Sequence, residues 1–563
     1  MKSEINEAHK QYMVSIVSED FTSKSKKFWS YVASKRQDSA GVAPLKNTEG
    51  FLQSDSLRKA EILNQQFQSA FTEEDTSNIP SKGDSPFPDM ENIQVNAEGV
   101  KKLLLDLKVD KATGPDSIPA FILKTASDEL APILTRIFQL SLETGDVPHD
   151  WRQAWVVPIF KKGERHLASN YRPVSLTSIT CKILEHIIHS SIMKHFDQHA
   201  TLTDSQHGFR RKRSCVTQLV VTVHEIAQHL AQDSQVDVIL LDFSKAFDKV
   251  PHARLLTKLA HYGVRNKTLN WISAFLSQRQ QQVALEGVLS PSVAVQSGVP
   301  QGTVLGPLLF LAFINDLPDN IKFSNTKLFA DDSLLFKQIT SPEDSLQLQK
   351  DLSSLEQWEK TWQMAFNPDK CNVIRIAPNK EKDILQTAYS LHGQTLETTS
   401  SNKYLGVSVA DDLSWGKHIT NIANKGNRTL GFLRRNFRDC TDTVKEATYK
   451  TMVRPILEYA SPVWDPITQK DSSELEKVQR RAARYVFNRY GDRNPGCVTD
   501  MLTTLNWEPL SERRLNDRLT LLYKINNGIV DINKSQFYSA GDSRTRGAQR
   551  LFQERSSHPV LFN

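Results

Sequence analysis

The sequence predicts an α+β fold in which helices surround an antiparallel sheet. An apolar run, VDVILL, leads into Asp242, and a second stretch, KLFADDSLLF, carries Asp331 and Asp332 between two apolar runs. Short apolar runs of this kind indicate strands. Apolar residues recur with helical spacing over 56–71 and 126–143. Because the two strand segments are far apart in the chain, we expect them to pair side by side in one sheet and to bring their aspartates together.

Two adjacent carboxylates at the tip of a hairpin repel each other unless a cation neutralises them, and hard oxygen ligands suit Mg²⁺. Each segment also has a plainer interpretation. Asp331 and Asp332 fit a polar β-turn, and Asp242 fits a cap on the turn or helix that follows it. The strands alone leave both interpretations open.

Composition favours an intracellular protein, in the cytoplasm or the nucleus. The chain has 563 residues, 39% of them hydrophobic, with no run of about 18 apolar residues. The N-terminus, MKSEINEAHKQY, lacks an apolar signal core. The five widely spaced cysteines fit neither a disulfide framework nor a zinc knuckle. We therefore expect no membrane span, no secretion and a reducing environment.

Positive charge is concentrated near the C-terminus. Residues 421–563 hold 24 Lys and Arg against 16 Asp and Glu, a net of +8, whereas the whole chain carries +6. This distribution indicates that a polyanion binds there. Within this part, LEKVQRRAARYVFNR predicts an amphipathic helix with cations at i, i+3, i+4 and i+7. Such a face suits phosphates, although solvated amphipathic helices show the same pattern.

The remaining segments follow in chain order. Residues 3–36 show a short helical stripe, and the polar, turn-rich stretch 72–92 predicts a flexible linker. We expect helices over 178–196, 253–278 and 303–315. A hairpin, QQVALEGVLSPSVAVQ, precedes the last of them, and polar residues 537–563 predict disorder.

Two groups of cations precede the first aspartate. A strand ending in PIFKKG carries Lys161, and the neighbouring segment NYRPVSLTS carries Arg172. Together they could place two cations beside a triphosphate, or they could be solvated surface charges. Four consecutive cations at 210–213 likewise suit either solvent or phosphate contacts.

Three carboxylates that converge on one site suit two divalent metals. Metal ions roughly 3.5–4 Å apart need bridging carboxylates, activate a hydroxyl and stabilise an in-line displacement at phosphorus. The sequence therefore predicts nucleotidyl transfer, with catalysis by positioning and electrostatics.

The order of the motifs resembles a known family. FSKAFDKVPH follows Asp242, and SGVPQGTVLGP, FADD, FNPDKC and KYLGV come after it, while GPDSIPAFILK, PIFKKG, NYRPVSLTS and QHGFRRKRS precede it. Over residues 100–525 this series resembles the reverse transcriptase of non-LTR (LINE-type) retrotransposons, most similar to the jockey and CR1 group.

The resemblance implies a right-hand polymerase: α+β fingers, a palm with an antiparallel sheet, a helical thumb and a helical N-terminal extension. The implied divisions are 1–95 for the extension and linker, 96–200 for fingers, 201–410 for palm, 411–530 for thumb and 531–563 for a disordered tail, with the reverse transcriptase core over about 142–410. It implies an RNA template, a DNA primer or target, and dNTPs; protein partners stay unknown.

The resemblance also assigns site residues. Asp242, Asp331 and Asp332 match the catalytic carboxylates, and with the main-chain carbonyl of Phe243 they would hold two Mg²⁺ ions, or Mn²⁺. The residues matched to the nucleotide site are Lys161 and Arg172 for the triphosphate, Phe247 as the steric gate against a ribose 2′-hydroxyl, Gln301 for positioning, and Lys370 near pyrophosphate as a general acid. The residues matched to nucleic-acid binding are Gly302, the primer-grip residues Tyr404, Leu405 and Gly406, and the helical cations Lys477, Arg480, Arg481 and Arg484.

Phe247 also fits an ordinary core phenylalanine. No endonuclease or RNase H domain is expected in the chain, so we interpret it as a partial reading frame holding polymerase and thumb. Two alternatives to an active reverse transcriptase remain: a decayed copy that only binds RNA, and an RNA-dependent RNA polymerase, which Phe247 opposes.

Overall fold

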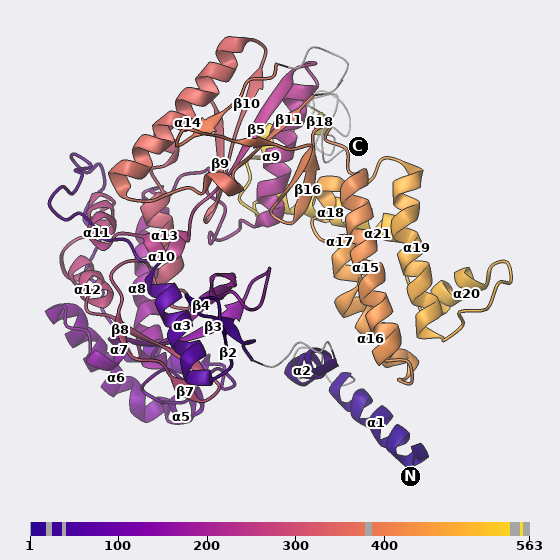
Figure 1. Cartoon of the computed structure of the whole chain (residues 1–563), viewed down its shortest axis with the longest axis horizontal. Helices are drawn as coiled ribbons and strands as arrows, with labels where there is room; N and C mark the ends of the chain where they lie inside the picture. The colour runs from indigo at the N-terminus through magenta and orange to yellow at the C-terminus, as the bar shows by residue number, and fades with distance from the viewer. Residues whose placement is uncertain (1, 18–24, 36–40, 378–384, 541–551, 555–563) are drawn as a thin grey trace.

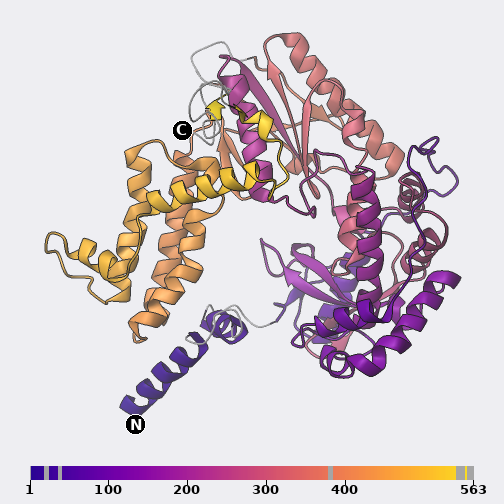
Figure 2. The ribbon, with the colours of Figure 1, turned by 180° about the vertical axis from the view of Figure 1, so that it is seen from behind.

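The computed structural model describes residues 2–17, 25–35, 41–377, 385–540 and 552–554. Figure 1 shows three groups of elements: a central sheet, a second and smaller sheet with its helices, and a set of C-terminal helices on the opposite side. Figure 2 shows from behind that the second sheet and the C-terminal helices project from the central sheet as two arms. None of the described helices is both long and apolar enough to cross a membrane.

The central sheet has the strand order β14-β11-β5-β10-β9. Its strands are β5 (Gln235–Asp242), β9 (Asn325–Phe329), β10 (Asp332–Ile339), β11 (Asn372–Ile376) and β14 (Glu397–Thr398). β5 lies between β10 and β11 and is antiparallel to both, and β10 is antiparallel to β9. This confirms the prediction that the two aspartate-bearing strands pair in one antiparallel sheet.

Alternate side chains of the central sheet enter two different cores, because neighbouring residues of a strand point to opposite faces. Ile239 and Leu335 belong to one core with α13 (Leu305–Ile314) and α14 (Pro342–Trp362). Val238 and Phe336 belong to the other, with α9 (Cys215–Leu230) and the C-terminal helices. Both faces are covered, which explains why these strands are apolar nearly throughout.

The second sheet has the order β4-β3-β6-β7, with β8 also paired to β6. Its strands are β3 (Gln153–Phe160), β4 (Tyr171–Leu176), β6 (Gln280–Leu285), β7 (Val288–Leu289) and β8 (Val293–Ala294). β3 and β4 are antiparallel, β6 pairs antiparallel with β7 and β8, and β3 and β6 are parallel. The predicted hairpin is therefore confirmed, although it lies in this sheet and outside the central one.

Helices surround the second sheet. They are α3 (Ser56–Gln68), α4 (Ala97–Leu105), α5 (Ala120–Thr125), α6 (Ser127–Thr144), α7 (His149–Arg152), α8 (Ile179–Gln198), α11 (His252–His261) and α12 (Asn266–Leu276). A short pair, β1 (Leu45–Lys46) and β2 (Leu52–Gln53), precedes α3. The single helix predicted over 253–278 is in fact two, since Gly263 takes a φ of 87° between α11 and α12.

Residues 72–92 differ from the predicted flexible linker, because they are bound along α11. The Glu74 carboxylate accepts hydrogen bonds from the Ala253 and Arg254 amides and lies 3.3 Å from the Arg254 guanidinium. Lys82 pairs with Asp316 at 2.8 Å. Polar composition predicted exposure but did not reveal these buried partners.

The C-terminal group begins with a hairpin of β15 (Ser401–Tyr404) and β16 (Val407–Ala410). The helices that follow are α15 (Gly416–Asn436), α16 (Asp442–Met452), α17 (Arg454–Glu458), α18 (Ser461–Trp464), α19 (Gln469–Val486), α20 (Cys497–Thr504) and α21 (Leu510–Asn526). Two N-terminal helices, α1 (Lys2–Val17) and α2 (Ser25–Lys35), replace the single predicted stripe, and Phe28 and Tyr31 of α2 pack against Phe437.

The predicted disorder at 537–563 falls mostly outside the described residues. Within them, β17 (Tyr538–Ala540) pairs with β18 (Phe552–Glu554). Short elements complete the chain: α10 (Ala246–Lys249), β12 (Ser390–Leu391), β13 (Gln394–Thr395), and 3-10 turns at Ala168–Asn170, Pro318–Asn320, Pro368–Lys370 and Lys534–Gln536.

Candidate active site

The three predicted carboxylates converge where β5 and β10 meet. Asp242 ends β5, Asp332 begins β10, and these two residues are direct cross-strand partners. Asp331 occupies the turn between β9 and β10, directly after Ala330, whose φ of 54° is left-handed. The antiparallel register therefore brings together side chains that are about ninety residues apart in the sequence.

This cluster carries unbalanced negative charge. Desolvation and the neighbouring Asp331 and Asp242 carboxylates raise the pKa of Asp332 to about 6. Desolvation also raises the pKa of Asp331, with a smaller contribution from Asp242. The Lys370 ammonium lies 3.1 Å from the Asp242 carboxylate. Among the described residues, it is the cation that forms an ion pair with the cluster.

A cavity of about 460 Å³ lies beside the carboxylates. Its lining comes from the central sheet, the second sheet and α3, and includes Lys161, Arg172, Asp242, Phe243, Phe247, Gln301, Gly302, Asp331 and Lys370. The structure thus brings every residue matched to the nucleotide site to one cavity. The positive charges of Arg172 and Lys161 partly counteract the rise in the pKa of Asp331.

Phe247 forms one wall of the cavity. Its ring is stacked on Phe310 of α13 with centroids 4.4 Å apart, and Phe209 lies edge-on at 6.4 Å. The Phe247 carbonyl accepts a hydrogen bond from the Val299 amide at 2.8 Å. Backbone and ring are therefore both fixed, and the ring is a core residue and a cavity wall at once.

Gln301 is oriented by a residue that the sequence did not single out. Its amide donates to the Asp248 carboxylate at 2.9 Å, and its carbonyl accepts from the Ser175 amide at 2.7 Å. Gly302, with a φ of 111°, passes so close to Ser175 that an added Cβ would lie 2.5 Å from the Ser175 oxygen. The close approach that Gly302 permits here is to β4.

Helix α3 supplies a wall that sequence reasoning missed. Gln66, Phe67 and Ala70 line the cavity, although the prediction placed this helix in an N-terminal extension. The usable signal was the apolar stripe of α3, which needed a surface to cover. Nothing in the sequence identified that surface as one face of the second sheet, where α3 packs against side chains of β3, β4 and β6.

The β15–β16 hairpin lies next to the C-terminal helices. Tyr404 is 4% exposed and its hydroxyl accepts from Gln218 at 3.1 Å, so its side chain is part of the core. At the tip, the Leu405 carbonyl accepts from the Tyr459 hydroxyl at 2.8 Å, and a Cβ on Gly406 would lie 2.8 Å from the Tyr459 ring. Only the tip of this predicted primer grip is accessible.

The predicted cations of α19 meet different environments. Lys477 pairs with Glu474 at 2.6 Å, and Arg481 donates to Asn427 at 3.0 Å. Arg480 lines a hollow with Glu476, Glu508 and Glu512. Arg484 donates to the Arg489 and Asp492 carbonyls and so fixes the loop after α19. These contacts do not form one continuous basic face.

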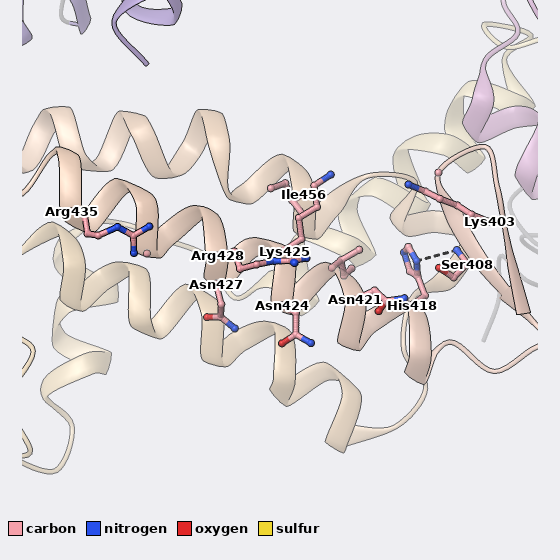
Figure 3. Close-up of a pocket in the computed structure, with 13 residues that line it drawn as sticks. Lys403, Ser408, His418, Asn421, Asn424, Lys425, Asn427, Arg428, Arg435 and Ile456 are labelled. Atoms are coloured by element: carbon pink, nitrogen blue, oxygen red, sulfur yellow. Dashed lines mark hydrogen bonds between the residues drawn. The ribbon is translucent and has the colours of Figure 1, made fainter. Parts of the chain in front are cut away.

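A basic groove lies along α15 instead, as Figure 3 shows. It measures about 1100 Å³ and is lined by Lys403, Gly406, Ser408, His418, Asn421, Ile422, Asn424, Lys425, Asn427, Arg428, Gly431, Arg435 and Ile456. These thirteen residues include four Lys or Arg and three Asn and contain neither Asp nor Glu. Because α15 is also rich in cations, the signal was in the sequence, but α19 showed the more regular spacing.

Oxygen donors at the carboxylate cluster fit magnesium. The excess negative charge and the raised carboxyl pKa values are what a bound divalent cation would relieve. Phe243 forms an antiparallel bridge with Phe366. The two hydrogen bonds of this bridge run from the Ser244 amide to the Ala365 carbonyl and from the Asn367 amide to the Asp242 carbonyl, so neither of them uses the Phe243 carbonyl. Within the described ranges, however, no group of three or more His, Cys, Asp or Glu side chains is arranged to hold a metal ion unaided.

Comparison with known proteins agrees with this geometry. Residues 159–409 match the family model described as reverse transcriptase (RNA-dependent DNA polymerase). The chain is 27% identical over 462 residues to the RNA-directed DNA polymerase from mobile element jockey of Drosophila melanogaster, covering 78% of this chain and 50% of the relative. It is 27% identical over 414 residues to the probable RNA-directed DNA polymerase from transposon BS of the same species, covering 70% and 44%.

A more distant relative is the retrovirus-related Pol polyprotein from type-2 retrotransposable element R2DM of Drosophila melanogaster, 26% identical over 319 residues, covering 54% of this chain and 29% of the relative. The chain spans about half the length of the first curated relatives it matches. The matched family model includes both aspartate-bearing strands and the β15–β16 hairpin. Residues 159–409 therefore resemble a reverse transcriptase domain, and the chain is similar to the RNA-directed DNA polymerases of the mobile elements jockey and BS.

Proposed function

We propose that this chain is an RNA-directed DNA polymerase that extends a DNA 3′-hydroxyl on an RNA template. The observation that carries the proposal is the register of β5 and β10, which sets Asp242 opposite Asp332 beside a cavity containing Lys161 and Arg172. In this proposal the central sheet is the palm, the second sheet with its helices is the fingers, and α15–α21 form the thumb.

Different residues of the cavity would contact the triphosphate and the sugar of a bound dNTP. Lys161 directly follows β3 and Arg172 lies in the neighbouring strand β4, and both would bind the triphosphate by charge-assisted hydrogen bonds. The sugar would lie against the Phe247 ring, where a 2′-hydroxyl would clash. Because Phe310 supports this ring from behind, the ring cannot easily yield, which favours deoxynucleotides.

Asp242, Asp331, Asp332 and the Phe243 carbonyl would hold magnesium. When bound, Mg²⁺ would lower the pKa of the attacking hydroxyl and stabilise negative charge at phosphorus. Lys370, 3.1 Å from Asp242, stands where it can give a proton to the leaving pyrophosphate. The chain's own contribution is otherwise to position the reactants and to exclude water.

The growing duplex would leave along the groove of α15. Lys403 and Gly406 at the hairpin begin this groove, and Lys425, Arg428 and Arg435 continue it along the helix. Cations and amides without carboxylates suit a sugar-phosphate backbone and give no means of reading the sequence. The structure thus favours α15 over α19 as the surface that follows the duplex.

Primer extension tests the proposal. The purified chain with Mg²⁺, dNTPs and a DNA primer on an RNA template should add nucleotides, and Asp331→Ala should lower the rate by at least about 10³-fold. A second variant, Asp369→Ala, changes an aspartate near the same region but outside the three-carboxylate cluster and should retain activity.

Two results would contradict the proposal. Equal incorporation by the parent chain and Asp331→Ala would show that these carboxylates do not act in catalysis. Absence of incorporation by the parent chain, together with tight RNA binding, would favour the decayed RNA-binding copy instead.

A further inference from the structure

The turn that carries Asp331 is held from behind by a buried glutamine. Gln206 is 2% exposed, and its side-chain oxygen accepts hydrogen bonds from the Ala330 amide at 2.9 Å and the Gly208 amide at 2.7 Å. Ala330 is the residue directly before Asp331. Gln206 lies outside the cavity, so it does not contact a bound nucleotide.

The hydrogen bonds fix the orientation of the Gln206 amide. Both partners are N–H donors, so only the carbonyl oxygen can face them. Ala330 adopts a left-handed φ of 54°, which is unfavourable for a residue with a Cβ. An acceptor at the Ala330 amide therefore compensates a strained residue at the point where the chain turns into Asp331.

The backbone around Gln206 is built for this contact. Residues 205–207 pair with β9 through His207 to Leu328 and Leu328 to Ser205, both at 2.9 Å. A Cβ on Gly208 would lie 2.4 Å from the Ala330 nitrogen, so only glycine permits so close an approach. The segment consequently behaves as an extra strand beside the catalytic hairpin.

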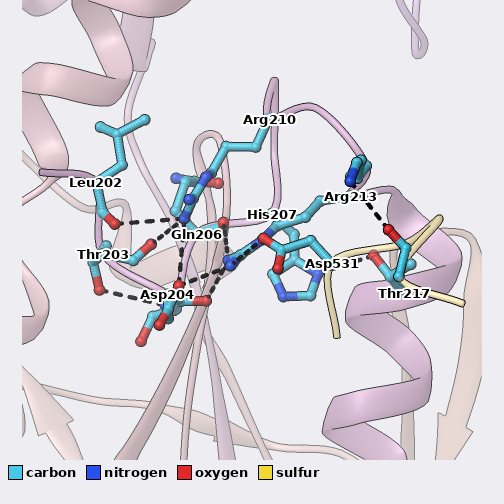
Figure 4. A network of polar contacts seen from close by, with 12 residues as sticks. Leu202, Thr203, Asp204, Gln206, His207, Arg210, Arg213, Thr217 and Asp531 are labelled. Carbon is cyan, nitrogen blue, oxygen red and sulfur yellow. Dashed lines mark hydrogen bonds and ion pairs between the residues drawn. The ribbon is translucent and has the colours of Figure 1, made fainter. Parts of the chain in front are cut away.

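The same segment is fixed from its other side, as Figure 4 shows. Arg213 donates to the Gln206 and Asp204 carbonyls at 3.0 and 2.8 Å, and its guanidinium pairs with Asp531 at 2.7 Å. Asp531 follows the last thumb helix, α21. The basic run at 210–213 therefore serves partly to anchor Gln206, since Arg213 is only 6% exposed.

We propose that Gln206 is a positioning residue for Asp331, acting through the Ala330 amide to keep the aspartate turn in the geometry that binds the divalent metal. This inference rests on the proposed polymerase function for its kinetic effect. Its structural effect depends on the contact alone. A loosened turn should lower the chemical rate and the metal affinity while leaving dNTP binding by Lys161 and Arg172 nearly unchanged.

Gln206→Met tests the inference, because methionine keeps the size of the side chain and lacks the acceptor. We expect kcat to fall about 30-fold with the KM for dNTP within about threefold, since misplacement of a catalytic group chiefly affects the transition state. Gln338→Met, the same change at the far end of β10, is the matched control and should behave as the parent chain.

Two measurements do not need catalysis. Hydrogen exchange of a peptide covering residues 328–333 should be about tenfold faster in Gln206→Met, because the Ala330 amide loses its partner. Mn²⁺ binding, followed by electron paramagnetic resonance of the free ion, should weaken about tenfold in the same variant. Neither quantity should change in Gln338→Met.

The outcomes are distinguishable. If Gln206→Met matches the parent chain in exchange and in Mn²⁺ affinity, the inference is wrong whatever the activity. If exchange becomes faster in Gln206→Met while Mn²⁺ affinity and kcat both match the parent chain, the contact does not position the metal-binding aspartate, and the inference also fails. If the parent chain extends no primer but exchange and Mn²⁺ affinity change as expected, Gln206 holds the turn and the proposed function fails.

Discussion

The cavity beside the carboxylates and helix α19 both contain residues that the sequence singled out, yet only the cavity brings those residues together. Residues of β4 and β5, Lys161 directly after β3, and Asp331 in the turn between β9 and β10 line one cavity. On α19, four regularly spaced cations instead face glutamates, an asparagine and a loop, while the basic groove lies on α15. The difference teaches that short motifs at strand ends identify positions, whereas helical periodicity identifies only a face.

Among the predictions that compare the two regions, the largest expected effect concerns Phe247 in the wall of the cavity. Phe247→Ala removes the ring that is stacked on Phe310, so a ribose 2′-hydroxyl would no longer clash. We expect the preference for dNTP over NTP, measured as the ratio of kcat/KM values, to fall about 100-fold.

Phe209→Ala is the control for the gate, because Phe209 lines the same cavity and packs edge-on against Phe247. It should leave the dNTP preference nearly unchanged. A similar loss in both variants would mean that general packing, and not a steric clash at position 247, sets the selectivity. A parent chain that accepts NTPs as readily as dNTPs would rule out the gate altogether.

An intermediate effect would separate α15 from α19. The double variant Lys425→Ala, Arg428→Ala should weaken binding of an RNA–DNA hybrid about tenfold, and the slope of log affinity against log salt concentration should decrease by about 2, because two phosphate contacts are lost. The matched pair Lys477→Ala, Arg480→Ala on α19 should change affinity by less than about twofold. A larger loss of affinity in the α19 variant than in the α15 variant would indicate that α19 contacts the duplex.

The smallest effect is electrostatic and arises in the carboxylate cluster beside the cavity, since the groove of α15 has no carboxylate in its lining. The pKa of Asp332 is raised from 3.8 to about 6, so the folded protein holds this proton more tightly than the unfolded chain. Ionisation of Asp332 therefore destabilises the fold increasingly as pH rises from about 4 to 6, and this penalty is absent below that window.

Asp332→Asn should remove the penalty. Without divalent cations at pH 8, we expect it to be more stable than the parent chain by about 1 kcal/mol after allowance for solvent screening. The advantage should shrink toward zero as pH falls to 4, measured by thermal denaturation across this range. A constant difference at every pH would show that repulsion among the carboxylates is not the cause.

Strand pairing was the most predictable part of the fold. The apolar runs around Asp242 and Asp331 predicted two paired strands, and the register of β5 and β10 confirms it. Residues 72–92 were the least predictable, because Glu74 binds the start of α11 from a stretch whose composition indicates a loop. Local composition indicates the propensity of a segment to form a loop, but it does not reveal a buried ion pair with a residue far away in the sequence.

By itself, the sequence predicted which residues would form the site: the carboxylates at the strand ends, Lys161, Arg172 and Phe247. These residues lie in motifs at strand ends and tight turns, which period-two patterns and turn residues identify. Only the tertiary structure decided what surrounds them. It placed α3 at the cavity, formed a basic groove along α15, and set Gln206 behind Ala330. The physical reason is that strand and helix periods arise from neighbours along the chain, whereas a cavity wall, a groove or a buried hydrogen bond depends on which distant segments pack together.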